Sequence, residues 1–123
     1  MRGKRGFTLI EVLIVVIILG ILATIAVPQF TKLVARSRTA EAYVTLGAIK
    51  TGEEIYRLEG TGYTATLTDL DIIFPDGGTG SPNFDYTAVA DATTYTITAT
   101  GKESAVGVVV TLEQDGTSDV TIP

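Results

Sequence analysis

The sequence predicts an α+β fold: a long amino-terminal helix whose second half packs on a small antiparallel β-sheet of about four strands. The first observation is a helical pattern over residues 7–59, with an apolar first half and an amphipathic second half. The second is a series of short segments after residue 83, rich in threonine, valine, tyrosine and isoleucine and separated by turn residues.

The amino-terminal part of the helix is predicted to cross a membrane. Glu11 is the one charged side chain between Phe7 and Thr31, and a helix needs roughly 20 apolar residues to span the bilayer core. Three cationic residues precede this segment, Arg2, Lys4 and Arg5. Because such a tail stays on the cytoplasmic side, the remainder of the chain is expected outside.

Glu11 is an unusual residue for a membrane helix. A carboxylate costs about 2–3 kcal/mol near the bilayer centre and less near an end, whereas the helix dipole returns only about 0.3–1 kcal/mol. The position therefore favours a positively charged partner. Our hypothesis is that this partner is a free amino group, created when the chain is cut just before Phe7.

Two other interpretations of the segment are open. A cleaved secretory signal has a basic start and an apolar stretch, and Thr24-Ile25-Ala26 offers a weak cleavage site. Its apolar stretch is usually about 7–15 residues, which is shorter than here. An ordinary single-pass anchor fits the length. Neither accounts for Glu11.

The motif Gly6-Phe7-Thr8-Leu9-Ile10-Glu11, after a short basic leader and before an apolar run from Val12 to Ala23, resembles the class III signal of type IV pilins and type II secretion pseudopilins. In that family a prepilin peptidase cuts after the glycine and methylates the new amino terminus. The resemblance implies cleavage between Gly6 and Phe7, N-methylation of Phe7, and pairing of Glu11 with the amino group of a neighbouring subunit.

The resemblance also implies the domain organisation. Residues 1–6 would be the leader peptide, 7–30 the transmembrane and assembly helix, and 31–123 the periplasmic or extracellular head. Loss of the leader removes three basic side chains and would take the formal charge from −5 to −8. Pro28 cannot donate a helical hydrogen bond, so a kink is predicted there, with Gly20 as a second soft point. In pilins the comparable stretch can lose helix in the filament.

The second half of the helix, residues 31–59, is predicted to be amphipathic. Apolar or small residues recur at three- and four-residue steps and form one stripe: Leu33, Ser37, Ala40, Val44, Ala48, Thr51, Ile55 and Leu58. Lys50 and Glu54, and likewise Glu53 and Arg57, have the spacing of helix-surface ion pairs. The charged residues fit a solvated helix face, or contacts of Lys32, Arg36 and Arg38 with acidic groups of neighbouring subunits.

The head is predicted to continue with a long connection and a sheet within residues 84–122. Gly60 and Gly62 are predicted to end the helix, because glycine tolerates left-handed backbone angles. Residues 63–83, rich in glycine and proline, form a loop that we expect to be the display surface. The predicted strands are Phe84–Ala90, Thr94–Thr100, Gly107–Glu113 and Asp119–Ile122.

Composition argues against an enzyme. The chain has no cysteine and no histidine, so it lacks the commonest general base and the thiolate ligands of zinc. Asp69 with Asp71, or Asp115 with Asp119, could offer oxygens to calcium, but their spacing does not match an EF-hand loop. We predict no cofactor and no metal site. From Glu59 onward ten acids face a single base, Lys102, so direct nucleic-acid binding is not expected.

The sequence thus predicts a structural subunit of a type IV pilus filament. Its expected partners are further copies of itself in a helical homopolymer, prepilin peptidase, the pilus or secretion assembly machinery, and the membrane. We expect a single pass of the inner membrane before assembly and the cell surface afterwards. One alternative is a type II secretion pseudopilin, which would stay in the periplasm. Another is a single-pass anchor whose head binds a ligand or ion.

Overall fold

The structure is a computed structural model that describes residues 6–60 and 62–123. Residues 1–5 of the predicted leader, with its three cationic side chains, therefore lie outside the described residues. The chain divides into two compact units, Met1–Thr31 and Lys32–Pro123. Each unit is described by itself below.

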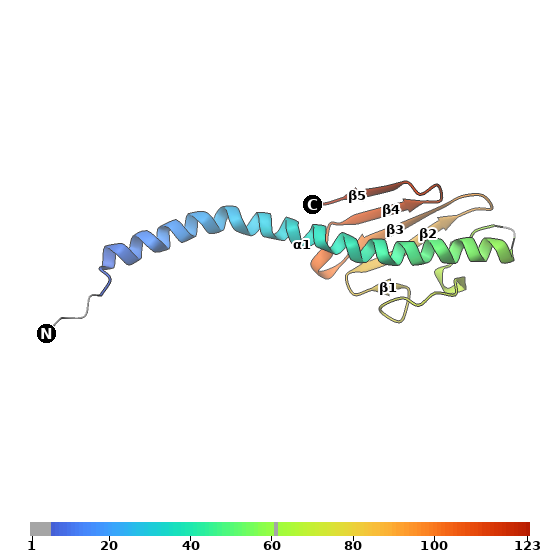
Figure 1. The fold of residues 1–123 in the computed structure, drawn as a ribbon, viewed down its shortest axis with the longest axis horizontal. Helices are drawn as coiled ribbons and strands as arrows, with labels where there is room; N and C mark the ends of the chain where they lie inside the picture. The colour runs from blue at the N-terminus through green and yellow to red at the C-terminus, as the bar shows by residue number, and fades with distance from the viewer. Residues whose placement is uncertain (1–5, 61) are drawn as a thin grey trace. The chain divides into compact units, whose positions relative to one another are not determined.

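A single α-helix, α1, extends from Leu9 to Glu59 and contributes to both units (Figure 1). Gly6, Phe7 and Thr8 precede it without helical structure. Pro28 lies inside α1 and does not end it. The kink at Pro28 and Gly20 stays a prediction.

The first unit consists of the apolar part of α1. Every described residue from Gly6 to Leu33 is exposed, including its large aliphatic side chains. The most apolar stretch of α1 has a mean hydropathy of 3.0. Among the described residues, α1 is the one helix that is long and apolar enough to cross a membrane. Exposed aliphatic side chains at this density require a lipid or protein environment.

The second unit carries a five-stranded antiparallel sheet in the order β1-β2-β3-β4-β5. Its strands are β1 (Gly80–Ser81), β2 (Phe84–Ala90), β3 (Tyr95–Gly101), β4 (Val109–Glu113) and β5 (Ser118–Thr121). Short 3-10 helices lie at Leu67–Asp69 (η1) and Glu103–Ala105 (η2). The four predicted strands are confirmed within two residues at each end. The additional strand, β1, has only two residues, too few to give an alternating pattern.

The core of the second unit lies between the carboxy-terminal half of α1 and one face of the sheet (Figure 1). Leu46 and Ile49 of α1 are fully buried with Phe84, Ile97 and Val110 of the central strands. Side chains alternate between this face and solvent along β2 and β3, as expected for a sheet covered on one side. The predicted α+β fold is confirmed.

The face of α1 that packs on the sheet is not the predicted stripe. All eight stripe residues, from Leu33 to Leu58, are exposed. The buried residues of α1 form a neighbouring face: Ala35, Ala42, Thr45, Leu46, Ile49, Gly52 and Glu53. Both faces have helical spacing, so periodicity alone could not tell which of them is buried. The buried face also contains small and polar residues, which weaken its apolar pattern.

Two glycines permit close backbone approach, one at the end of β3 and one where the segment after α1 meets the β2–β3 turn. A Cβ at Gly101 would run into the carbonyl oxygen of Ala105 in η2, and a Cβ at Gly62 would lie 2.6 Å from Cα of Ala92. Gly60 does not have the left-handed backbone angles that we predicted for the helix end. Its N–H instead donates to the carbonyl of Arg57 at 3.3 Å.

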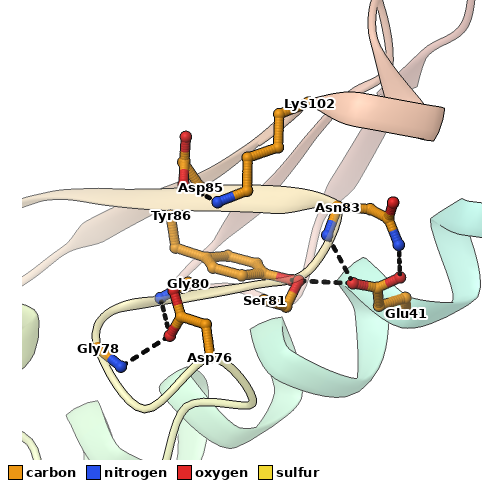
Figure 2. A network of polar contacts seen from close by, with 9 residues as sticks. All are labelled: Glu41, Asp76, Gly78, Gly80, Ser81, Asn83, Asp85, Tyr86 and Lys102. Carbon is orange, nitrogen blue, oxygen red and sulfur yellow. Dashed lines mark hydrogen bonds and ion pairs between the residues drawn. The ribbon is translucent and has the colours of Figure 1, made fainter.

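The Glu41 carboxylate ties the middle of α1 to the β1–β2 turn (Figure 2). It accepts hydrogen bonds from Oγ of Ser81 at 2.7 Å, from the Asn83 backbone N–H at 3.2 Å and from Asn83 Nδ2 at 2.8 Å. Ser81 is fully buried and lies 3.3 Å from the Tyr86 hydroxyl. The Oδ1 atom of Asn83 accepts a bond from Ser104. One carboxylate thus connects the helix to both ends of the turn.

We expect Glu41→Ala to destabilise the head by about 2 kcal/mol at pH 7, since each hydrogen bond to a charged group contributes roughly 1.5–3 kcal/mol before solvent screening. Burial acts to raise the pKa of Glu41, but the bonds from Asn83 and Ser81 and the charge of Arg38 outweigh it and lower the pKa. The stabilisation is therefore present above the ordinary value of 4.5 and is lost as the pH falls through the lowered pKa.

Urea unfolding of the full chain in detergent micelles, at pH 7 and at pH 3, measures this difference. Glu113→Ala is the matched control, because the exposed Glu113 side chain makes no hydrogen bond with the described residues. An equal loss of stability in both variants would show that the Glu41 bonds do not stabilise the head.

Candidate functional site

The predicted scissile bond lies just before the start of α1. Gly6 and Phe7 are outside the helix, and the Phe7 side chain is 87% exposed. A Cβ added at Gly6 would meet no atom within 4 Å. A peptidase requires a non-helical, accessible backbone, and this segment has both properties among the described residues.

Glu11 and Thr8 form a reciprocal pair of hydrogen bonds at the first turn of α1. The Thr8 N–H donates to Glu11 Oε2 at 2.9 Å, and the Glu11 N–H donates to Thr8 Oγ1 at 3.2 Å. The Val12 N–H donates to the Thr8 carbonyl at 3.2 Å. This is a capping box, in which two otherwise unpaired backbone donors are satisfied.

The capping box gives Glu11 a role within its own chain. Sequence reasoning missed Thr8, although the spacing of a threonine three residues before a glutamate was available as a signal.

The second carboxylate oxygen of Glu11, Oε1, makes no hydrogen bond with the described residues. Phe7, Glu11, Val12, Val15 and Val16 line an open hollow that is almost entirely apolar. The site therefore combines one carboxylate oxygen with an apolar surface.

The residues predicted to soften the helix lie in a region with side-chain bonds to the backbone. Thr24 donates to the Ile21 carbonyl at 2.6 Å, and Thr31 donates to the Pro28 carbonyl at 2.8 Å. Such bonds compete with the helical ladder and often bend helices. A Cβ at Gly20 would meet no atom within 4 Å, so packing inside the described chain does not require this glycine.

The exposed stripe of α1 in the second unit is a second candidate surface. Its large apolar members are exposed: Leu33 (61%), Val44 (76%), Ile55 (49%) and Leu58 (86%). Lys32 and Arg36 are also exposed, and Lys102–Asp85, at 2.7 Å, is the one ion pair among the described residues. This face can bind a protein surface that is apolar with acidic groups beside it.

The two predicted ion pairs on α1 do not form. The Glu53 carboxylate is buried and accepts the Thr64 N–H at 3.0 Å. Arg57 instead donates to the Tyr63 hydroxyl at 3.1 Å, with its guanidinium 5.3 Å from the ring centroid. That hydroxyl donates to Glu54 at 3.2 Å. The head therefore uses these charges to fix the segment that follows α1.

The predicted display loop is partly anchored. Tyr63, Leu67, Leu70 and Phe74 are buried in the core, whereas Ile73 is 94% exposed. Among the described residues, no three or more histidine, cysteine, aspartate or glutamate side chains form a group that could hold a metal ion. The Asp69 and Asp115 carboxylates accept bonds from Thr64 and Thr117.

A glycine-rich turn in the loop is also built around a carboxylate (Figure 2). Asp76 accepts the Gly78 N–H at 2.8 Å and the Gly80 N–H at 3.0 Å. These two bonds lower the pKa of Asp76. The turn is therefore ordered by backbone donors, while Asp76, Gly77, Gly78 and Thr79 stay exposed.

Two family profiles match the chain. Residues 1–27 match the prokaryotic N-terminal methylation motif, which covers Gly6, Phe7 and Glu11. Residues 28–108 match the profile described as "Type IV minor pilin ComP, DNA uptake sequence receptor". No solved structure matches the chain significantly.

The similar curated proteins are pilins. A fimbrial protein of Pseudomonas aeruginosa is 36% identical over 112 residues, which cover 85% of this chain and 73% of the relative. The type IV major pilin protein PilA of Myxococcus xanthus is 50% identical over 67 residues, 54% of this chain and 30% of the relative. The type IV major fimbrial protein FimA of Dichelobacter nodosus is 36% identical over 88 residues, 72% of this chain and 55% of the relative. With its methylation motif, exposed apolar helix and α+β head, the chain belongs to the type IV pilins, the structural subunits of pili.

Proposed function

We propose that this pilin is inserted in the inner membrane as a precursor, cut between Gly6 and Phe7, methylated on Phe7 and polymerised through residues 7–30. The observation that supports this most is a helix segment whose apolar side chains are all exposed and whose single carboxylate lies in its first turn. The methylation motif covers the same residues.

The pairing of Glu11 with a neighbouring amino group follows from its environment. Apolar contacts alone give little preference for protein over lipid, because lipid tails are as apolar as aliphatic side chains. An ion pair in a medium of low dielectric constant is stronger and more directional. With Oε2 held by Thr8, the Oε1 atom is available to the methylated amine of Phe7 in the next subunit. This pair would set the register between subunits.

The exposed stripe of α1 in the head is a second apolar surface. Val44, Ile55 and Leu58 are its exposed apolar side chains near the middle and end of α1. An exposed apolar face on a small head is expected to be covered in the assembled state. We therefore assign this face to contacts between subunits in the filament.

Expression with and without prepilin peptidase, in cells that have the assembly machinery, tests the proposal. We expect the chain to lose the mass of residues 1–6 only with the peptidase, and sheared surface filaments to contain the shortened chain. Processed chain in periplasmic filaments would identify a pseudopilin instead. A chain that stays full length with active peptidase would leave a simple membrane anchor.

DNA binding is a second candidate because the profile that matches residues 28–108 describes a DNA uptake sequence receptor. Residues 32–123 carry six basic and thirteen acidic side chains, and Lys102 is already paired with Asp85. Because affinity for DNA rests mainly on cationic contacts to phosphate, we expect a Kd above about 10⁻⁴ M at physiological salt. Fluorescence anisotropy with duplex DNA and the full chain in detergent measures it. Micromolar, salt-dependent binding would contradict this expectation.

A further inference from the structure

Glu53 is a buried carboxyl group that forms no ion pair with the described residues. Its exposure is 0%, although it lies on α1 between the half-buried Lys50 and the exposed Arg57. Its Oε2 atom accepts the Thr64 N–H at 3.0 Å, and its Oε1 atom has no hydrogen-bond partner among the described residues. A buried ionised carboxylate in this state is costly, and the neutral acid is much less so.

The groups around Glu53 come from three elements. On α1, Glu54 has the same charge, and Arg57 is directed to Tyr63. In the segment after α1, Asp69 accepts the Thr64 hydroxyl at 3.2 Å.

On β3, the Tyr95 hydroxyl is also buried without a partner among the described residues. The Tyr95 ring packs edge-on against Tyr63, with the centroids 4.7 Å apart. Burial, and then the charges of Glu54, Tyr63 and Glu53, raise the pKa of Tyr95 to about 12. Tyr95 is therefore a neutral hydroxyl, and the described residues that shift the pKa of Glu53 include no cation.

We propose that Glu53 is a proton-dependent latch that, as a neutral acid, holds the segment 62–70 against the end of α1. In this state its carbonyl oxygen accepts the Thr64 N–H, and the head contains no buried negative charge at this position. Ionisation leaves a buried negative charge beside Glu54 and favours opening of the segment to water. The latch concerns the head alone and holds whether or not the filament assignment is correct.

The direction of the pH dependence follows from the same geometry. Burial raises the pKa of Glu53, the Thr64 bond opposes this, and the charge of Glu54 adds to the increase. Folding therefore gains most below the ordinary value of 4.5, and this gain is lost as the pH rises through the raised pKa. A head outside the cell would hold its connecting segment more firmly in acid than in neutral surroundings.

Amide hydrogen exchange of the mature full chain in detergent micelles, corrected for the intrinsic rates, tests the latch. Between pH 4 and pH 8, we expect the exchange protection of the Thr64 amide and its neighbours to fall. The fall should be about tenfold for each pH unit by which the pKa of Glu53 lies above its ordinary value. Glu53→Gln should keep high protection at every pH, because the amide oxygen still accepts the Thr64 N–H. Glu59→Gln, at an exposed position of the same helix, should behave as the wild type.

The latch is overturned if wild-type protection is independent of pH or if Glu53→Gln changes with pH as the wild type does. Should Glu53→Gln fail to fold, a carboxyl ¹³C titration of the wild-type protein decides the question. A Glu53 signal that titrates above 4.5 supports the latch, and one at or below 4.5 excludes it.

Discussion

Replacing Glu11 with glutamine should abolish filaments while leaving the precursor in the membrane and open to cleavage. Glutamine is isosteric, and its amide oxygen can still accept the Thr8 N–H, so the capping box and the start of α1 remain. Only the charge is lost. If the charge of Glu11 binds the amine of the next subunit, its removal leaves that buried cation unpaired, which typically costs about 3–5 kcal/mol per contact. Repeated at every subunit, this prevents growth.

Thr8→Ala separates capping from charge. It removes the hydroxyl that accepts the Glu11 N–H at 3.2 Å and keeps the Thr8 N–H that donates to the carboxylate. A lost cap costs about 1 kcal/mol, so filaments should persist in reduced amount. Electron microscopy of the sheared surface fraction compares the two variants. Normal filaments from Glu11→Gln would show that its charge is not needed for assembly.

Replacing Gly6 with valine should reduce cleavage by about a hundredfold or more, because displacement of a scissile bond by as little as about 1 Å can cost that factor. The described chain has open space at this position, so the change should not disturb the subunit itself. An uncut chain keeps Arg2, Lys4 and Arg5. Drawing each of these across the bilayer costs roughly 2.5–3.5 kcal/mol, so uncut chain should not enter filaments.

Gly20→Val is the matched control for Gly6→Val. A Cβ added at Gly20 would likewise meet no atom within 4 Å, but Gly20 lies 13 residues beyond Phe7 and so away from the scissile bond. Immunoblots of membrane fractions should show the shortened chain for Gly20→Val and the full-length chain for Gly6→Val. Full cleavage of the Gly6→Val variant would contradict the assignment of the scissile bond between Gly6 and Phe7.

The fold could be predicted because its main elements have strong local signals. The apolar run after Phe7 identified the helix, and segments rich in threonine, valine, tyrosine and isoleucine between turn residues identified the strands, without reference to contacts. β1 was missed because two residues carry no pattern. The buried face of α1 was missed because Thr45, Gly52 and Glu53 interrupt its apolar character. Their burial depends on partners from distant segments, such as Thr64.

The position of the candidate site stays a prediction from the sequence, and its hydrogen bonds were only partly predictable. Gly6, Phe7 and Glu11 belong to a motif whose fixed spacing can be identified in the sequence. The link between Glu41 and the β1–β2 turn joins residues about 40 positions apart, so no local pattern encodes it. The same holds for Glu53, which has the spacing of a surface ion pair yet lies inside the head. Tertiary packing decides which of two spacing-compatible roles a charged residue takes.

The decisive measurement is the intact mass and amino-terminal sequence of the protein recovered from its native cell envelope. For a processed pilin we expect an amino terminus at N-methylated Phe7, with residues 1–6 absent. A Met1 terminus in cells with active prepilin peptidase would contradict processing at Gly6 and, with it, assembly through a freed Phe7 amine.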